Sequence, residues 1–221
     1  MSDQSKNPGH PLEPFFLESR LNRIDSVLSQ RSYSTVVVLD GVSSEHNISA
    51  VLRSADAFGL QKIFIVGPQF SHTKGISMGV ENWLSVKRME TAEDVINQLK
   101  SEGFKIALLQ SKEISQDLGK PYCLVQELPF KENIALVFGN EKRGVSEEFQ
   151  LAAEYFAYIP MVGFVESLNI SVAAALTFYT ALLQGRPCIT EQERLSLREE
   201  WLKKDLRGGE EIFRRVTGES R

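Results

Sequence analysis

Cysteine and histidine are both scarce in this sequence of 221 residues. Its two cysteines, Cys123 and Cys188, are too few for a disulfide framework or a structural zinc site. Its three histidines, His10, His46 and His72, are scattered and lack the spacing of metal ligands. The sequence therefore predicts a protein without a metal.

Long apolar runs and targeting segments are lacking as well. The longest nearly apolar stretch, residues 171–183, contains polar side chains and is shorter than the roughly 20 residues that a membrane-spanning helix needs. Residues 1–14 have neither the basic nor the apolar region of a signal peptide, and their three prolines predict an extended arm. We expect a cytoplasmic protein with no membrane partner.

A strong excess of basic residues is also absent. Lys plus Arg number 25 against 29 Asp plus Glu, so the protein carries no global positive field that attracts a polyanion. Residues 36–185 hold 12 basic and 17 acidic residues, whereas residues 186–221 hold 9 and 8. The chain ends are thus the better candidates for binding nucleic acid, although a mixed, solvated helix face is the simpler interpretation for either end alone.

What the sequence does contain is the composition of a globular protein, with 42% hydrophobic and 24% charged residues. Several helical segments separate short apolar runs that predict strands. These runs cover residues 35–39, 62–66, 104–109, 134–138 and 155–159. Alternating strands and helices predict an α/β fold with a parallel sheet, in which functional residues gather at the carboxyl ends of the strands.

Amphipathic helices flank the sheet region. The first is predicted from an apolar stripe of Leu17, Leu21, Ile24 and Leu28. After Pro187, a capping box of Thr190 and Glu193 opens a second helix, whose apolar positions are Leu195, Trp201, Leu202 and Leu206. The predicted organisation is an arm and helix at 1–34, a sheet domain at 35–185 and a helical extension at 186–221.

Three common cofactor and catalytic loops are missing. No G-x-G-x-x-G follows a strand, which disfavours a Rossmann-type oxidoreductase. The loop Gly139–Gly144 has the glycine spacing of a P-loop, but Val145, followed by Ser146, stands where the phosphate-binding lysine is needed, which disfavours a nucleotide hydrolase. G-x-S-x-G is absent too, which disfavours an α/β-hydrolase.

The first of three polar segments that follow strands covers residues 45–59. Asn47 can cap a helix there, and Gly59 can end it. Arg53 lies roughly 240° around the helix from Asn47, so the two side chains do not share a face. From the residues alone, a structural salt bridge is the simpler interpretation for Arg53.

The other two segments cover residues 138–144 and 159–175. The former can be a plain glycine-rich turn with Glu141 solvated. In the latter, Ser167 or Asn169 can cap a helix of small residues. Taken singly, each segment also has an ordinary structural interpretation.

Taken together and in this order, the three segments resemble the motifs of the SpoU–TrmH branch of the SPOUT RNA ribose 2′-O-methyltransferases. The pattern is N-x-x-A-x-x-R…F-G, then F-G-x-E-x-x-G, then I-P-M-x-G-x-x-x-S-L-N-x-S-x-A. The matching residues are Asn47, Ala50, Arg53, Phe58 and Gly59; Phe138, Gly139, Glu141 and Gly144; and Ile159, Pro160, Met161, Gly163, Ser167, Leu168, Asn169 and Ser171.

The resemblance implies a SPOUT-type parallel sheet flanked by helices, with a deep trefoil knot in its carboxyl-terminal part and short helical extensions at both chain ends. It also implies S-adenosylmethionine as cofactor and a homodimer with active sites near the interface. By motif position, Gly139, Ile159 and Leu168 contact the cofactor, with Ser167 close by and Leu108 as a further contact. The implied catalytic residues are Arg53, Asn47, Glu141, Ser167 and Asn169.

The function that the resemblance implies is 2′-O-methylation of a ribose in RNA, with a guanosine in the tRNA D-loop as the expected target, because the extensions look like those of the TrmH tRNA enzymes. Two alternatives stay open. One is 2′-O-methylation of ribosomal RNA, and the other is a non-catalytic RNA-binding or assembly factor with the same fold.

Overall fold

The computed structural model describes residues 9–67, 79–110 and 122–218, so His72 and the first eight residues lie outside the described residues. The chain forms two compact units. The sheet domain comprises Ser32–Cys188, and the terminal unit combines Met1–Arg31 with Ile189–Arg221. Sequence patterns treat the two chain ends as separate arms, but here both belong to one unit.

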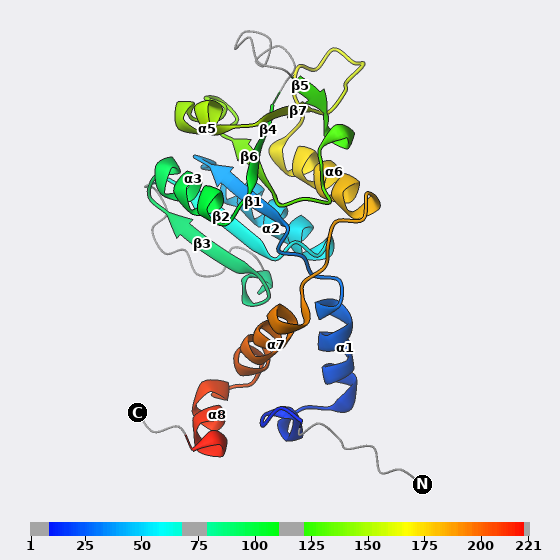
Figure 1. Ribbon diagram of the computed structural model, residues 1–221, viewed down its shortest axis with the longest axis vertical. Coiled ribbons are helices and arrows are strands. Elements are labelled where there is room, and N and C mark those ends of the chain that lie inside the picture. Colours follow the sequence, from blue (N-terminus) through cyan, green and yellow to red (C-terminus); the bar gives the residue numbers. More distant parts are fainter. Residues whose placement is uncertain (1–8, 68–78, 111–121, 219–221) are drawn as a thin grey trace. The chain divides into compact units, whose positions relative to one another are not determined.

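The described residues of the sheet domain form a seven-stranded sheet in which the paired strands run parallel (Figure 1). The strand order is β3-β2-β1-β6-β4-β7-β5. The strands are β1 (Thr35–Asp40), β2 (Lys62–Val66), β3 (Ser85–Met89), β4 (Lys105–Leu109), β5 (Tyr122–Leu124), β6 (Ile134–Gly139) and β7 (Tyr155–Tyr158). The predicted α/β fold with a parallel sheet is confirmed.

The two edge strands, β3 and β5, were not predicted from the sequence. Strand β3 exposes Lys87 and Arg88, and β5 is only three residues long. Each has a neighbouring strand on one side only, so neither needs the continuous apolar run that marks a strand buried on both faces. The five predicted strands are present, with ends that differ by one residue at most.

Helices cover both faces of the sheet. One face carries α2 (Glu45–Ala57) and α6 (Ile170–Leu183), and the other carries α3 (Ala92–Ser101) and α5 (Glu147–Ala152). Strand β1 serves both cores, because Val37 and Leu39 point to α2 and α6 whereas Val36 and Val38 point to the opposite face. Short 3-10 helices complete the order at Glu13–Phe15, Val80–Asn82 and Val125–Glu127.

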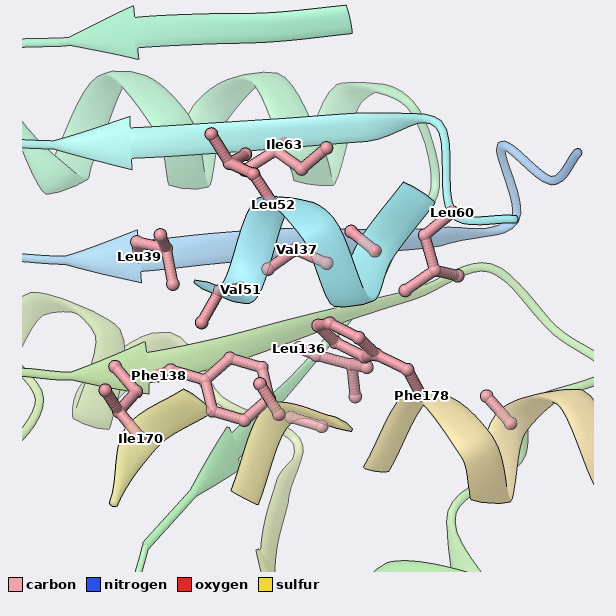
Figure 2. Packing of buried hydrophobic residues seen from close by; sticks show 14 of the residues in the cluster. Val37, Leu39, Val51, Leu52, Leu60, Ile63, Leu136, Phe138, Ile170 and Phe178 are labelled. Carbon is pink, nitrogen blue, oxygen red and sulfur yellow. The ribbon is translucent and has the colours of Figure 1, made fainter. Parts of the chain in front are cut away.

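The core beneath α2 and α6 fixes the position of both helices on the sheet. Figure 2 shows Leu52 of α2 against the sheet beside Ile63, and Phe178 of α6 beside Leu136. The Phe138 and Phe178 rings meet edge to face, with centroids 5.9 Å apart. Burial of these side chains holds the two helices against β1 and β6, where the carboxyl ends of the strands lead into the polar segments.

The starts of α2 and α6 correct one prediction and confirm another. Helix α2 is capped by Ser44, whose hydroxyl accepts the Asn47 amide N–H at 3.3 Å, so Asn47 is not the cap. Helix α6 is capped by Asn169, which accepts the Ser171 N–H at 2.8 Å. Gly59 follows α2 with φ of 72°, as a left-handed glycine that ends a helix does.

The terminal unit consists of α1 (Glu18–Leu28), α7 (Glu191–Asp205) and α8 (Gly209–Thr217). The predicted capping box of Thr190 and Glu193 opens α7. Two predicted apolar positions are wrong, because Leu17 and Leu195 are exposed, and Leu197 takes the buried place. Arg198 joins the two chain ends through ion pairs to Glu13 at 2.9 Å and Asp25 at 2.7 Å.

Candidate functional site

The middle of the sheet brings the first two motifs to one edge. Asp40 at the end of β1 is the register partner of Gly139 at the end of β6. Since parallel strands end at the same edge, the loops that follow β1 and β6 leave the sheet next to each other. The first leads into α2 and the second carries Glu141, which places the motif residues within reach of one another.

A chain of side-chain hydrogen bonds joins all three motifs at this edge. The Asn47 amide donates from Nδ2 to Glu141 Oε1 at 2.6 Å. Its Oδ1 accepts from Nδ2 of Asn169 at 3.2 Å. One side chain from α2 therefore connects the loop after β6 with the start of α6, and three of the five residues predicted to be catalytic lie together.

The loop after β6 is held in one shape by Asn140. Its backbone exchanges two hydrogen bonds with that of Gly144, at 2.9 and 2.8 Å. Its side-chain oxygen accepts the amides of Lys142 and Arg143, and its Nδ2 donates to the Gly41 carbonyl at 2.8 Å. The loop is thus closed on itself and tied to the residue that follows β1.

Gly139 is required by the close return of this loop. A Cβ atom added at Gly139 would lie less than 3.0 Å from backbone atoms of Gly144 and Val145, a distance that real side chains essentially never show. Any larger residue displaces the loop that carries Glu141. The motif glycine therefore has a packing reason of its own, whichever ligand its backbone meets.

Asp40 is a residue at the same edge that the sequence analysis missed. Asp40 is buried, with only 6% of the residue exposed. Its Oδ2 accepts a hydrogen bond from the Ser146 amide at 2.7 Å. Burial raises the pKa of the Asp40 carboxyl, and the Ser146 hydrogen bond only partly opposes that rise. The one available signal was an ionisable residue that ends an otherwise apolar strand.

The Ser146 hydroxyl lies near the same carboxylate but outside hydrogen-bond geometry. It is buried and has no hydrogen-bond partner in the part of the chain that the structure describes. Arg143 and Glu148 also act on the Asp40 carboxyl through their charges, in opposite directions. Asp40 therefore holds the far end of the loop at an electrostatic cost.

The third motif supplies unpaired backbone. Across residues 160–168, no amide or carbonyl hydrogen-bonds to another backbone group of the described residues. Ser167 is exposed, whereas Ile159 and Leu168 are half-buried. This stretch offers backbone donors and acceptors next to apolar side chains, which suits a nucleoside-like group recognised through the main chain. The residues present therefore fit the implied cofactor.

Arg53 and Leu108 do not join this cluster. Arg53 is exposed and makes no ion pair or hydrogen bond within the described ranges, so the salt bridge that the residues alone favoured is not found. Leu108 lies inside β4, paired with β6 and β7, and its side chain is buried in the core beneath α3. Any contact of Leu108 with a ligand has to use its backbone.

Two other classes of site are not found among the described residues. In the described ranges, no three side chains of His, Cys, Asp or Glu are grouped so that they could hold a metal ion. None of the helices described here combines the length and the apolar character that crossing a bilayer requires.

Comparison with known proteins connects this geometry to a family. Residues 34–179 match the model of the SpoU rRNA Methylase family. A tRNA (guanosine(18)-2′-O)-methyltransferase of Aquifex aeolicus is 30% identical over 205 residues, which cover 88% of this chain and 94% of that protein. The enzyme of the same name from Thermus thermophilus is 32% identical over 199 residues, covering 85% and 97%.

Solved structures agree with the sequence matches. The crystal structure of an Aquifex aeolicus TrmH/SpoU tRNA modifying enzyme superposes with a TM-score of 0.72 at 30% identity, covering 86% of this chain and 98% of that one. An RNA 2′-O ribose methyltransferase gives a TM-score of 0.58 at 27% identity over 71% of this chain and 57% of the other. The first likeness extends beyond the sheet domain, because it spans more residues than that domain contains.

The buried Asp40 carboxylate generates a prediction about stability and pH. Its raised pKa means that the folded state binds the proton more tightly than the unfolded chain, whose Asp pKa is about 3.9. Its contribution to stability is therefore largest below that value and is lost as the pH rises through the raised pKa. Asp40→Asn keeps an acceptor for the Ser146 amide and removes the ionisation, so it should gain stability over the wild type between pH 4 and pH 7.

Urea unfolding midpoints at pH 4 and pH 7 measure this difference. Glu147→Gln, an exposed change on α5, is the matched control and should show no such gain. An Asp40→Asn protein that loses as much stability at pH 7 as at pH 4 contradicts the assignment of a destabilising buried charge.

Proposed function

This chain belongs to the SpoU methylase family, and from that premise we propose that it transfers a methyl group from S-adenosylmethionine to a ribose 2′-hydroxyl of tRNA in the cytoplasm. The observation that carries the proposal is the junction of all three family motifs through Asn47 at the carboxyl edge of the sheet. The proposed target is a guanosine, the nucleoside that the names of the relatives give, and we place it in the D-loop.

We propose the following roles for the residues of the site. Gly139, Ile159 and Leu168 bind the cofactor through their backbone, with Ser167 beside them. When bound, the cofactor supplies a methyl group on a sulfonium. Leu108 is retained only as a backbone contact, since its side chain is buried. The carboxyl-terminal strands and helix of the sheet domain thread the trefoil knot.

Arg53 acts on the RNA backbone in this proposal. An arginine side chain stays protonated at any physiological pH, so it serves poorly as a base. Its planar guanidinium binds a phosphate with two parallel hydrogen bonds, and this holds the neighbouring 2′-hydroxyl in line for attack. The exposure of Arg53 and its lack of a partner within the described residues leave it available to a phosphate. Asn47 and Asn169 orient the substrate, while Glu141 braces Asn47.

Cations of the terminal unit support RNA as the substrate. Most of the basic side chains that the structure describes there bind carboxylates, as Arg20 does with Asp205 at 2.7 Å. Arg23, Arg207 and Arg214 are exposed and have no such partner among the described residues. An electrically balanced unit can therefore still present free guanidinium groups to phosphates.

Helix α6 supports the proposed homodimer. Ile170, Ala174 and Phe178 face the core, while a second apolar stripe of Val172, Leu176, Tyr179 and Leu183 lies exposed on the opposite side. A helix that is apolar all round is normally buried on all sides. A second copy of this chain is the occupant that also completes the site, because Asn47 and Arg53 project from different sides of α2.

Incubation with labelled S-adenosylmethionine and separate pools of unmodified tRNA and ribosomal RNA tests the reaction itself. The expected result is label in tRNA, mapped to the 2′-oxygen of one D-loop guanosine. Label confined to ribosomal RNA supports the alternative substrate. Cofactor binding and RNA binding without any transfer support a non-catalytic factor.

The role of Arg53 is tested by Arg53→Ala. Loss of the phosphate clamp should lower the single-turnover rate of methyl transfer by about 100-fold or more, as removal of other transition-state donors does. The affinity for S-adenosylmethionine, measured by calorimetry, should stay unchanged. Lys100→Ala, an exposed cation on α3, is the control and should keep full activity. Near-normal transfer by Arg53→Ala refutes the role.

The dimer is tested by Leu176→Glu combined with Leu183→Glu. Two carboxylates on the exposed stripe of α6 should prevent association, because burying them in an apolar interface is costly. Sedimentation analysis should then give one chain mass of 24.9 kDa in place of twice that value for the wild type. Leu151→Glu changes an exposed residue of α5 and is the control, which should leave the dimer intact. A monomeric wild type overturns the proposal.

A further inference from the structure

Helix α2 ends with two backbone carbonyls that its own cap does not use. The Gly59 amide donates to the Asp56 carbonyl at 3.0 Å, and the Leu60 amide donates to Ala55 at 2.8 Å, as in a Schellman turn. That turn satisfies the carbonyls within the helix. The carbonyls of Phe58 and Gly59 come after it and need partners from elsewhere in the fold.

The partners come from the two segments that connect the sheet domain to the terminal unit. The Ser32 amide donates to the Gly59 carbonyl at 2.9 Å. The Arg186 guanidinium donates to the Phe58 carbonyl. The two segments are also joined directly, because the Ser32 hydroxyl donates to the Pro187 carbonyl at 2.5 Å.

Arg186 is unusual in being a buried charge, with only 7% of the residue exposed. Helix α2 has no basic residue of its own in its last turn. A cation at the carboxyl end of a helix interacts favourably with the helix dipole, so Arg186 supplies from another segment what the helix lacks. A buried arginine is otherwise costly, which argues that this position is specific.

The same helix carries Asn47 in its first turn and Arg53 in its third. A helix is stiff over such a length, so a change at its carboxyl end alters the direction of both side chains. The Phe58 ring, at the residue that Arg186 binds, packs against Tyr179 of α6 with centroids 5.9 Å apart. Arg186 thus acts at the end of α2 that also meets the second site-bearing helix.

We infer that Arg186 is a positioning residue for methyl transfer, which fixes α2 from the segments that lead to the terminal unit. This inference rests on the proposed function for its kinetic consequence. It assigns a mechanical role to the connectors, which hold the carboxyl end of α2 through Ser32 and Arg186 while RNA binds at Arg53. Chemistry at Arg53 then depends on contacts made at the opposite end of the helix.

Arg186→Met is the direct test, because it keeps a long unbranched apolar side chain and removes the guanidinium donors. The expected result is a fall in kcat of about tenfold or more, since small misplacements of reacting groups are costly, with the KM for S-adenosylmethionine unchanged. Arg186→Lys keeps a charged donor and should restore part of kcat. Gln184→Ala is the matched control, because it removes a side-chain bond to the Gln126 carbonyl, away from α2.

Hydrogen exchange gives a readout that does not depend on activity. In Arg186→Met, the amides of residues 54–58 should exchange faster while those of α3 keep their protection. Added tRNA should protect residues 54–58 in the wild type and lose that effect in the variant. Unchanged exchange at 54–58, or faster exchange throughout the sheet domain, overturns the inference.

The two proposals fail in distinguishable ways. A wild type that methylates no RNA refutes the proposed function, and the exchange of residues 54–58 still decides whether Arg186 fixes α2. An active wild type whose kcat is the same in Arg186→Met refutes the positioning role alone.

Discussion

The site depends on one side-chain amide, that of Asn47, which uses its donor and its acceptor toward two different segments of the chain. A hydrogen bond of this kind contributes about 1 kcal/mol to stability, so the two bonds cannot by themselves hold the segments together. The sheet does that, because β1 and β6 are neighbours and end at the same edge. Asn47 selects one arrangement of loops that the sheet has already brought close.

The same edge is where the fold accepts an electrostatic cost. After Thr35, strand β1 is apolar and buried up to its last residue, Asp40, whose carboxyl group is held out of water to accept one amide from the loop after β6. Stability alone favours an uncharged acceptor at such a position. An ionisable group stands there although the rest of the strand is packed in the core, and the loop that it anchors carries Gly139 and Glu141.

The parts of this structure that follow from the sequence are those with a local physical signal. Buried central strands show as short apolar runs. Gly59 marks a helix end because glycine adopts the left-handed conformation readily, and Asn169 marks a helix start because its side chain caps the first turn. The edge strand β3 has no such signal, because Lys87 and Arg88 are exposed and its other residues are only half-buried. Ser44 was overlooked because Asn47 is an equally good capping residue, and only the tertiary bonds to Glu141 and Asn169 decide between them.

Long-range features were beyond any local pattern. The joining of both chain ends in one unit depends on pairs such as Arg198 with Asp25, which are 173 residues apart. Likewise, Arg186 belongs to no sequence motif, and its hydrogen bond to the end of α2 is visible only in the folded chain. The family motifs, by contrast, did predict the function. Three motifs in a fixed order identify the family, although the contacts between them become visible only in the folded chain.

Two exposed features of the sheet domain have no counterpart among the described residues. They lie on α2 and α6, which pack against each other. Helix α2 presents Arg53 without a partner among the described residues, and α6 presents an apolar stripe that the described residues leave largely exposed. Each has an ordinary explanation alone, since exposed arginines and exposed leucines are common. Their occurrence on one helix pair, whose other faces form the core and the Asn47 junction, argues that the functional unit is larger than one chain. The core fixes α2 and α6 toward the sheet, and in the proposed function their outer faces meet RNA and a second subunit.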